Sequence, residues 1–267
     1  RHLRRLERVL IFRSPYPDVV IPDISVVDYV LQRAPEFGEK AALIDGVTGT
    51  TLSYDELASG IRRAAGGLAQ RGLAKGDVLA IYSPNTLYYP VAFHGAAYAG
   101  GVVTTVNPLY TSGELAKQLR DARARFLITA GPFVDKAREA AAEAGGIEKI
   151  FTFDGAPGTT PFSVLLDSEE LENPPQIDPA TDLVALPYSS GTTGLSKGVM
   201  LTHRNLVANM AQLLGTRSLV RELKKDDTLI AVLAGCMVLP AMFSAGLSPR
   251  SSFGENSAIS ERSGATS

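Results

Sequence analysis

The sequence predicts an α/β protein built on a parallel sheet, and three observations carry this prediction. Short apolar runs begin near Val78, Val102, Phe126 and Ile150, at a constant spacing of 24 residues. The segments between these runs have helical periodicity. The runs themselves lack alternation of polar and apolar residues, as expected of strands that crossover helices bury on both faces. The sequence therefore indicates a chain of βαβ units.

The composition is that of an ordinary globular protein. The 267 residues are 45% hydrophobic with a net charge of −2, which leaves room for one or two domains and gives no indication of nucleic-acid binding. A single cysteine, Cys236, excludes a disulfide within the chain, so a cytoplasmic location is the simpler expectation. The histidines His2, His94 and His203 have no metal-ligand spacing, and we expect no metal site.

Residues 78–112 contain no Asp, Glu, Lys or Arg, which raises the question of a membrane span. Prolines and asparagines divide the segment, and its longest uninterrupted part runs from Val91 to Val106. That part is shorter than the roughly 20 residues a spanning helix needs. A buried strand, helix and strand fit the segment better.

Start signals define three helices. Ser53 with Glu56 and Thr111 with Glu114 fit the capping box, and Thr202 is a candidate N-cap. Apolar stripes follow each signal: Leu57, Ile61, Ala64 and Leu68; Leu115, Leu119 and Ala122; Leu206, Met210 and Leu213. On the first of these helices we expect the solvent side to carry Arg62, Arg63 and Arg71.

The most informative motif runs from Tyr188 to Gly198 between two apolar runs, which places a loop at the end of the sheet, where α/β proteins bind ligands. Its hydroxyls can donate to phosphate, its glycines allow backbone N–H groups to converge on an anion, and Lys197 adds a positive charge. This pattern predicts a binding site for the phosphates of ATP. The candidate site residues are Ser189, Ser190, Gly191, Thr192, Thr193, Gly194 and Lys197.

Three other interpretations of the loop are weaker. A P-loop needs glycine before the lysine and Ser or Thr after it, whereas this chain has Ser196 and Gly198. Residues 194–198 also match G-x-S-x-G, which would make Ser196 the nucleophile of an α/β-hydrolase. The only histidine downstream is His203, seven residues on, so the triad cannot be completed. A surface linker fits the composition, but the two flanking apolar runs argue against it.

The motif and the residues after it resemble the signature of the adenylate-forming (AMP-binding) enzymes, most closely the 4-coumarate:CoA ligases and similar acyl-CoA synthetases. The resemblance extends from about Ile11 to about Leu233. Besides residues 188–205 it rests on residues 12–18, 21–22, 52–57, 107–111 and 114–115. It implies a ligase that uses ATP, Mg²⁺ and coenzyme A to convert a small carboxylic acid first to an acyl-adenylate and then to a thioester.

The same resemblance implies that only part of such an enzyme is present. We expect an N-terminal extension over 1–10, a partial AMP-binding domain over 11–233 with layered parallel sheets, and a divergent, disordered or frameshifted tail over 234–267. The family's later motifs, its histidine segment and its small C-terminal domain have no counterpart, so no catalytic residue is assigned. We also expect an apolar face to be left open where the missing half would pack.

Two functions from different classes follow. The first is a 4-coumarate-type acid:CoA ligase, represented here by an incomplete part that we expect to be inactive alone. The second is a non-catalytic nucleotide-binding or interaction protein that retains the phosphate loop. Within the first, an aromatic and a fatty acid both stay open as substrate, as does the oligomeric state.

Overall fold

The computed structural model describes residues 18–189, 197–215, 228–231 and 248–251. Seven strands form its main sheet: β3 (Val78–Tyr82), β4 (Val102–Val106), β5 (Ala124–Thr129), β6 (Lys149–Thr152), β7 (Thr160–Pro161), β8 (Leu183–Ala185) and β11 (Leu201–Thr202). They lie in the order β11-β8-β4-β3-β5-β6-β7, and all neighbours are parallel except the pair β11 and β8. The predicted α/β fold with a parallel sheet is confirmed.

The four predicted strand starts agree with the structure to within two residues, and a helix connects each successive pair. These helices are α4 (Tyr89–Tyr98), α5 (Ser112–Asp121) and α6 (Val134–Ala144), the last preceded by the 3-10 turn η1 (Gly131–Phe133). The other helices are α1 (Val26–Leu31), α2 (Ala34–Phe37), α3 (Tyr54–Gln70), α7 (Ser163–Leu166) and α8 (His203–Gly215). Both predicted capping boxes are formed, at the start of α3 and of α5.

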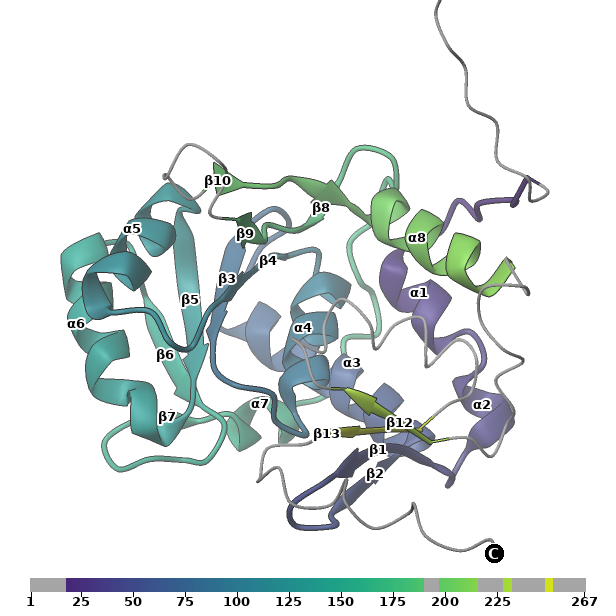
Figure 1. Cartoon of the computed structure of the whole chain (residues 1–267), viewed down its shortest axis with the longest axis horizontal. Coiled ribbons are helices and arrows are strands. Elements are labelled where there is room, and N and C mark those ends of the chain that lie inside the picture. Colours follow the sequence, from purple (N-terminus) through teal and green to yellow (C-terminus); the bar gives the residue numbers. More distant parts are fainter. Residues whose placement is uncertain (1–17, 190–196, 216–227, 232–247, 252–267) are drawn as a thin grey trace, which may run out of the picture.

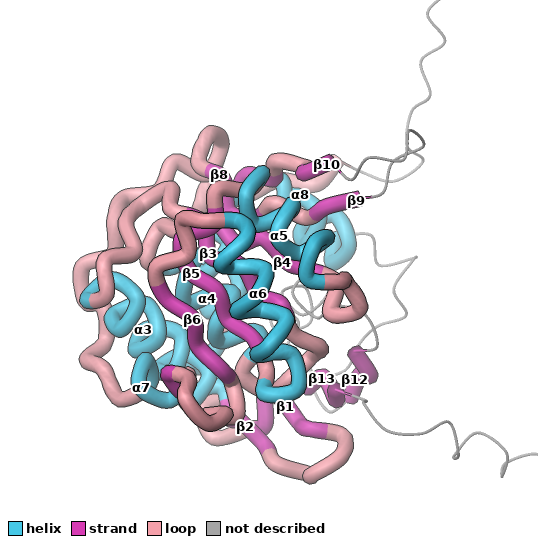
Figure 2. Tube along the Cα trace, turned by 90° about the vertical axis from the view of Figure 1, so that its left-hand side faces the viewer, coloured by secondary structure: helices cyan, strands magenta, loops and turns pink. Residues whose placement is uncertain are grey.

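The main sheet separates two apolar cores. Figure 1 shows α5 and α6 on one side of the sheet and α3 and α4 on the other. Successive residues along a strand serve opposite cores: Leu79 and Ile81 pack with α3 and α4, whereas Ala80 and Tyr82 pack with α5 and α6. This two-sided burial is the reason why the strands are continuously apolar. Figure 2 shows the same layers from the side.

The outer side of α3 is partly covered, which the sequence prediction missed. Arg62 was expected on the solvent side, but its Nε lies 2.6 Å from Oε2 of Glu170. The segment around α7 approaches α3 closely because Gly66 and Gly67 have no side chains. A Cβ on Gly66 would lie 2.1 Å from the carbonyl oxygen of Glu169. Arg62 is therefore only partly on the solvent side, with its side chain 37% exposed, because two helix glycines admit another segment there.

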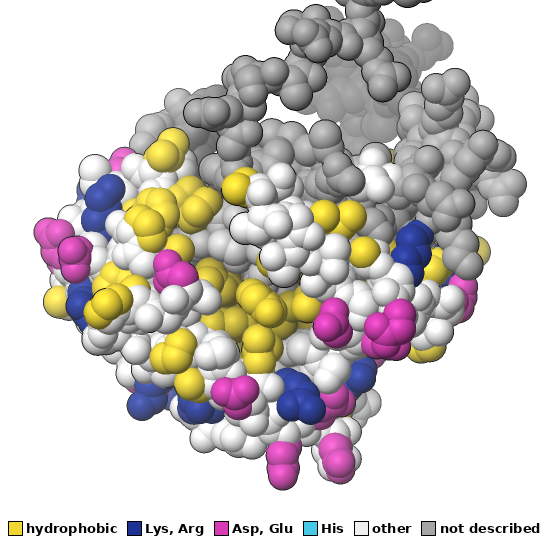
Figure 3. Space-filling view, turned by 90° about the horizontal axis from the view of Figure 1, so that it is seen from below, with side chains coloured by type: hydrophobic (Ala, Val, Ile, Leu, Met, Phe, Trp, Pro, Cys, Tyr) yellow, Lys and Arg dark blue, Asp and Glu magenta, His cyan; other side chains and the backbone are white. Residues whose placement is uncertain are grey.

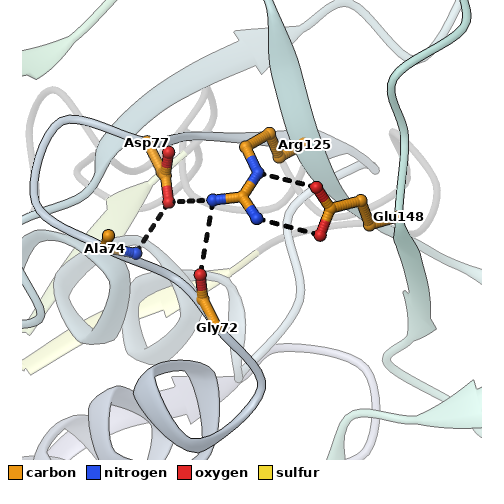
Figure 4. A network of polar contacts seen from close by, with 5 residues as sticks. All are labelled: Gly72, Ala74, Asp77, Arg125 and Glu148. Atoms are coloured by element: carbon orange, nitrogen blue, oxygen red, sulfur yellow. Dashed lines mark hydrogen bonds and ion pairs between the residues drawn. The ribbon is translucent and has the colours of Figure 1, made fainter.

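Ionic contacts fasten the amino edge of the sheet (Figure 4). The guanidinium of Arg125, in β5, makes a two-pronged contact of 2.8 and 2.9 Å with the carboxylate of Glu148, just before β6. Its Nη1 also donates to Asp77, just before β3, and to the carbonyl of Gly72 at 3.3 Å. Asp77 in turn accepts from the backbone N–H of Ala74 at 2.7 Å. The Arg125 side chain thus joins β5 to the starts of β3 and β6 and to the turn after α3.

A second, four-stranded sheet comprises β1 (Ala41–Asp45), β2 (Thr51–Ser53), β12 (Thr228–Ala231) and β13 (Ser248–Ser251). Its order is β12-β13-β1-β2, with β13 parallel to both of its neighbours. The four residues of β13 lie within 234–267, for which a disordered tail is expected, and that expectation stays a prediction for the tail as a whole. Their strand rests on main-chain pairing, which requires no hydrophobic pattern. The three predicted domain boundaries stay a prediction.

Some apolar side chains remain on the surface. Leu109 is 84% exposed in the turn after β4, and Met200 is 70% exposed between β10 and β11. On another face, hydrophobic side chains gather in the middle, with charged side chains around them (Figure 3). Among the described residues, no helix has the length and apolar character needed to cross a membrane. The apolar stretch at residues 78–112 forms buried strands and the ten-residue helix α4.

Candidate functional site

The two strands that flank the predicted phosphate loop form a β-hairpin at the carboxyl edge of the main sheet. β8 leads into β9 (Tyr188–Ser189), and β10 (Lys197–Gly198) leads back into β11. The two tip strands are antiparallel, with Ser189 opposite Lys197 and Tyr188 opposite Gly198. Figure 1 shows this hairpin across the top of the molecule. The two predicted flanking strands are therefore present, and the loop between them lies outside the described residues.

The described residues contain two of the seven predicted site residues, Ser189 and Lys197. The structure brings them together as direct cross-strand neighbours, one on each side of the loop. Both are exposed. The other five lie outside the described residues: Ser190, Gly191, Thr192, Thr193 and Gly194.

Tyr188 holds the two strands of the hairpin together at their base. A Cβ on Gly198 would stand 3.0 Å from the ring of Tyr188, so the glycine allows the ring to lie across the opposite strand. The Tyr188 hydroxyl donates to the carboxylate of Asp121, the last residue of α5. Burial, together with this negatively charged partner, raises the pKa of Tyr188, so the hydroxyl keeps its proton and remains a donor.

A buried amide fixes the strand that enters the hairpin. Gln118 of α5 donates from Nε2 to Oγ1 of Thr104 at 2.9 Å and to the carbonyl of Thr105 at 3.1 Å. The Thr104 hydroxyl then donates to the carbonyl of Leu186 at 2.8 Å. Gln118 is 4% exposed, so the network is shielded from water.

Sequence reasoning missed Thr104, Gln118 and Asp121 as parts of this site. A signal was available for Gln118, because it lies three residues after Leu115 and directly before Leu119, inside the apolar stripe of its helix. A polar residue at such a position is buried and needs a partner. Asp121 gives no comparable signal, since a carboxylate at a helix end is ordinary on a surface.

Lys197 supplies the positive charge of the hairpin. Within the described ranges it forms no ion pair, in contrast to the Lys75 ammonium, which lies 2.6 Å from the carboxylate of Asp182. An exposed ammonium at the mouth of a loop suits an anionic ligand. Among all the residues that the structure describes, no group of three or more His, Cys, Asp or Glu side chains is placed to hold a metal ion. A magnesium ion that arrives with ATP would have the phosphate oxygens as ligands.

The helix after the hairpin begins as predicted. Thr202 Oγ1 accepts from the backbone N–H of Asn205 at 3.2 Å, and the Asn205 side chain accepts from the N–H of Thr202 at 3.0 Å. His203 follows and is 1% exposed, and its Nδ1 accepts from the N–H of Val26 at 3.1 Å. Burial lowers the pKa of His203 to about 4. His203 is therefore a buried residue that joins α8 to α1.

Comparison with known proteins identifies the family. Residues 30–247 match the AMP-binding enzyme family. The chain is 42% identical over 229 residues to 4-coumarate--CoA ligase 3 of Oryza sativa subsp. japonica, a match that covers 85% of this chain and 41% of that protein. It is 40% identical over 225 residues to 4-coumarate--CoA ligase 1 of Petroselinum crispum, covering 84% and 41%. The chain thus spans about 41% of the length of these relatives.

Solved structures agree with this assignment. A long-chain-fatty-acid-CoA ligase from Archaeoglobus fulgidus superposes with a TM-score of 0.79 at 26% identity, over 91% of this chain and 50% of that one. A red-emitting luciferase from Phrixothrix hirtus has a TM-score of 0.82 at 20% identity, over 91% and 49%, which supports the fold alone. By its sequence and its fold, this chain belongs to the AMP-binding enzyme family.

Proposed function

We propose that the hairpin binds the polyphosphate of ATP and that this chain carries the phosphate-binding part of an acid:CoA ligase of the 4-coumarate type. In that reaction a carboxylate oxygen attacks the α-phosphorus of ATP, the bond to the β-phosphate breaks, and pyrophosphate leaves. The thiol of coenzyme A then attacks the acyl carbon, and AMP leaves. The support is the family membership and the similarity to proteins named 4-coumarate--CoA ligases.

One structural observation carries the proposal: the exposed Lys197 and Ser189 face each other across the opening of the loop at the carboxyl edge. At about 4 Å from a phosphate oxygen and an effective dielectric constant near 20, the ammonium would contribute roughly 4 kcal/mol before desolvation is subtracted. Serine hydroxyls are suitable donors to phosphate oxygens. The role of these two residues in the reaction is to bind and orient the leaving pyrophosphate.

Replacement of Lys197 tests the loop assignment. Lys197→Met keeps the length of the side chain and removes its charge, so we expect the affinity for ATP and for pyrophosphate, measured by titration calorimetry, to fall about tenfold or more. The melting temperature should stay unchanged, because Lys197 forms no ion pair within the described residues. Lys136→Met, an exposed lysine on α6, is the matched control. Unchanged pyrophosphate affinity in Lys197→Met would contradict the assignment.

Isotope exchange between pyrophosphate and ATP separates the ligase from the non-catalytic alternative. The ligase proposal requires exchange that depends on an added acid, at least when the remaining length found in the relatives is joined to this chain. Binding of ATP with no exchange in that longer protein would favour a non-catalytic nucleotide-binding protein. Parallel assays with 4-coumarate and with a long-chain fatty acid would decide which acid is the substrate.

A further inference from the structure

We propose that α5 is a positioning element for the phosphate loop, acting through the contact between Tyr188 and Asp121. This inference rests on the proposed phosphate-binding function. Neither Tyr188 nor Asp121 needs to touch phosphate in this proposal. Their role is to hold Ser189 and Lys197, the two residues that flank the loop, in one geometry.

Two polar residues of α5 lie one helical turn apart and hold the same segment, residues 186–188, which leads into the loop. Gln118 reaches the carbonyl of Leu186 through the Thr104 hydroxyl, and Asp121 accepts from Tyr188 two residues further along. Side chains three apart lie on the same face of a helix. Both views of the fold place β9 and β10 next to α5 (Figures 1 and 2). One face of α5 therefore fixes two successive points of the chain before the loop begins.

The Tyr188 side chain is in contact with both strands that flank the loop, so it can restrict the movement of both. Ser189 follows Tyr188 directly, so the anchor acts through a single peptide unit on the entering strand. On the returning strand the ring lies against Gly198, which directly follows Lys197. The hydrogen bond to Asp121 fixes the rotation of the ring, and the ring in turn fixes the separation of the two strands.

Such an anchor raises affinity because it holds Ser189 and Lys197 in the binding geometry before the ligand arrives. A loop whose ends are held in the binding geometry loses less conformational freedom when phosphate binds. The hydroxyl of Tyr188 remains protonated because burial and the neighbouring carboxylate raise its pKa. The anchor is accordingly intact over the ordinary pH range.

Tyr188→Phe is the first test, since it removes only the hydroxyl and keeps the ring against Gly198. We expect pyrophosphate affinity to fall about fivefold to tenfold, the loss expected from one charge-assisted hydrogen bond. Tyr82→Phe is the matched control, because the Tyr82 hydroxyl makes one hydrogen bond of 2.9 Å, to the carbonyl of Tyr110. Tyr82→Phe and Tyr188→Phe should lower the melting temperature by similar amounts, because each loses one hydrogen bond. The pyrophosphate affinity of Tyr82→Phe should stay within about twofold of the wild type.

Asp121 provides a second, independent route to the same answer. Asp121→Ala should weaken pyrophosphate binding as much as Tyr188→Phe, and the double variant should be no weaker than either single variant, because one contact is lost in all three. Asp121→Asn keeps a neutral acceptor and should fall between Asp121→Ala and the wild type. If Tyr188→Phe does not fold, the two Asp121 variants give the same comparison.

The possible failures are distinguishable. If the wild-type chain binds pyrophosphate and Tyr188→Phe or Asp121→Ala binds it equally well, the positioning role is wrong and the proposed function stands. Additive losses in the double variant would also overturn the positioning role, since the two residues would then act separately. If the wild-type chain binds no pyrophosphate, the proposed function falls, and this inference falls with it.

Discussion

The two edges of the main sheet are organised in opposite ways. At the amino edge Arg125 is fully engaged, with Asp77, Glu148 and the carbonyl of Gly72 as its partners. At the carboxyl edge the exposed Lys197 forms no ion pair within the described ranges. The comparison teaches that one edge uses its charges to join strands, while the other presents a charge to solvent, where a ligand can use it.

The two edges also differ in how their polar residues act on the backbone. The contacts of Arg125 connect strands to strands and to a turn. Those of Gln118, Thr104 and Tyr188 connect a helix to the strand that enters a loop. We therefore expect changes at the amino edge to alter stability alone, and changes at the hairpin to alter phosphate affinity.

The largest expected effect is on the pH dependence of stability. It concerns two buried histidines, one in α4 and one in α8. Burial lowers the pKa of both His94 and His203 to about 4 in the folded chain. Their ordinary value is about 6.5, so between these values the unfolded chain binds more protons. Stability should therefore fall as the pH drops from about 6.5 to about 4, by roughly 1.4 kcal/mol per pH unit for a fully shifted histidine.

Urea unfolding at several pH values checks this expectation. His94 is the better site for substitution, because both of its ring nitrogens are buried and have no hydrogen-bond partner among the described residues. His94→Leu should reduce the slope of stability against pH between 4 and 6.5 and should not destabilise the chain at pH 7. The acidic groups facing His203 are Asp182 and Asp28, and they stay unchanged in this variant. An unchanged slope would show that His94 does not carry the effect.

The second effect concerns α3, which lies away from the hairpin. Gly66→Ala would place a Cβ 2.1 Å from the carbonyl oxygen of Glu169, so we expect a loss of roughly 1–3 kcal/mol from overpacking. Alanine normally stabilises a helix relative to glycine by about 1 kcal/mol, so the sign is reversed here. Gly60→Ala in the same helix is the control, because its Cβ would have an ordinary 3.5 Å contact with Val91. Equal melting temperatures for the two variants would contradict the packing argument.

The smallest expected effect is the most direct test of the comparison between the edges. Arg125→Met removes the ionic contacts of the amino edge and should lower the melting temperature modestly, because the guanidinium is 34% exposed and water screens its charge. Its pyrophosphate affinity should match that of the wild type. Arg120→Met is the control, since the Arg120 side chain is 53% exposed and its Nη2 lies 3.8 Å from Oε1 of Glu143 while it donates to the Glu143 carbonyl at 2.7 Å, so it joins no strands. A fall in phosphate affinity in Arg125→Met would remove the distinction between the two edges.

The sequence by itself determined the elements and their repetition. The 24-residue spacing, the capping boxes at Ser53 and Thr111, and the start of α8 at Thr202 all recur in the structure. These features are readable because they depend on neighbours within a few residues, through backbone hydrogen bonds and the periodicity of burial. The phosphate-loop motif was readable for the same reason, since its donors are adjacent along the chain.

Only the tertiary structure decided the lateral order of the strands and the partners that come from distant segments. The order β4-β3-β5 places β3 in the middle, although the sequence has β3 first. Tyr188 meets Asp121 across 67 residues, and Arg62 meets Glu170 across 108. Such pairs depend on how helices pack on a completed sheet, and each residue alone resembles an ordinary surface or helix-end residue. The sequence therefore determined where the motif of residues 188–198 lies in the chain, and the packing of α5 against the hairpin determined how Tyr188, at the start of that motif, is held.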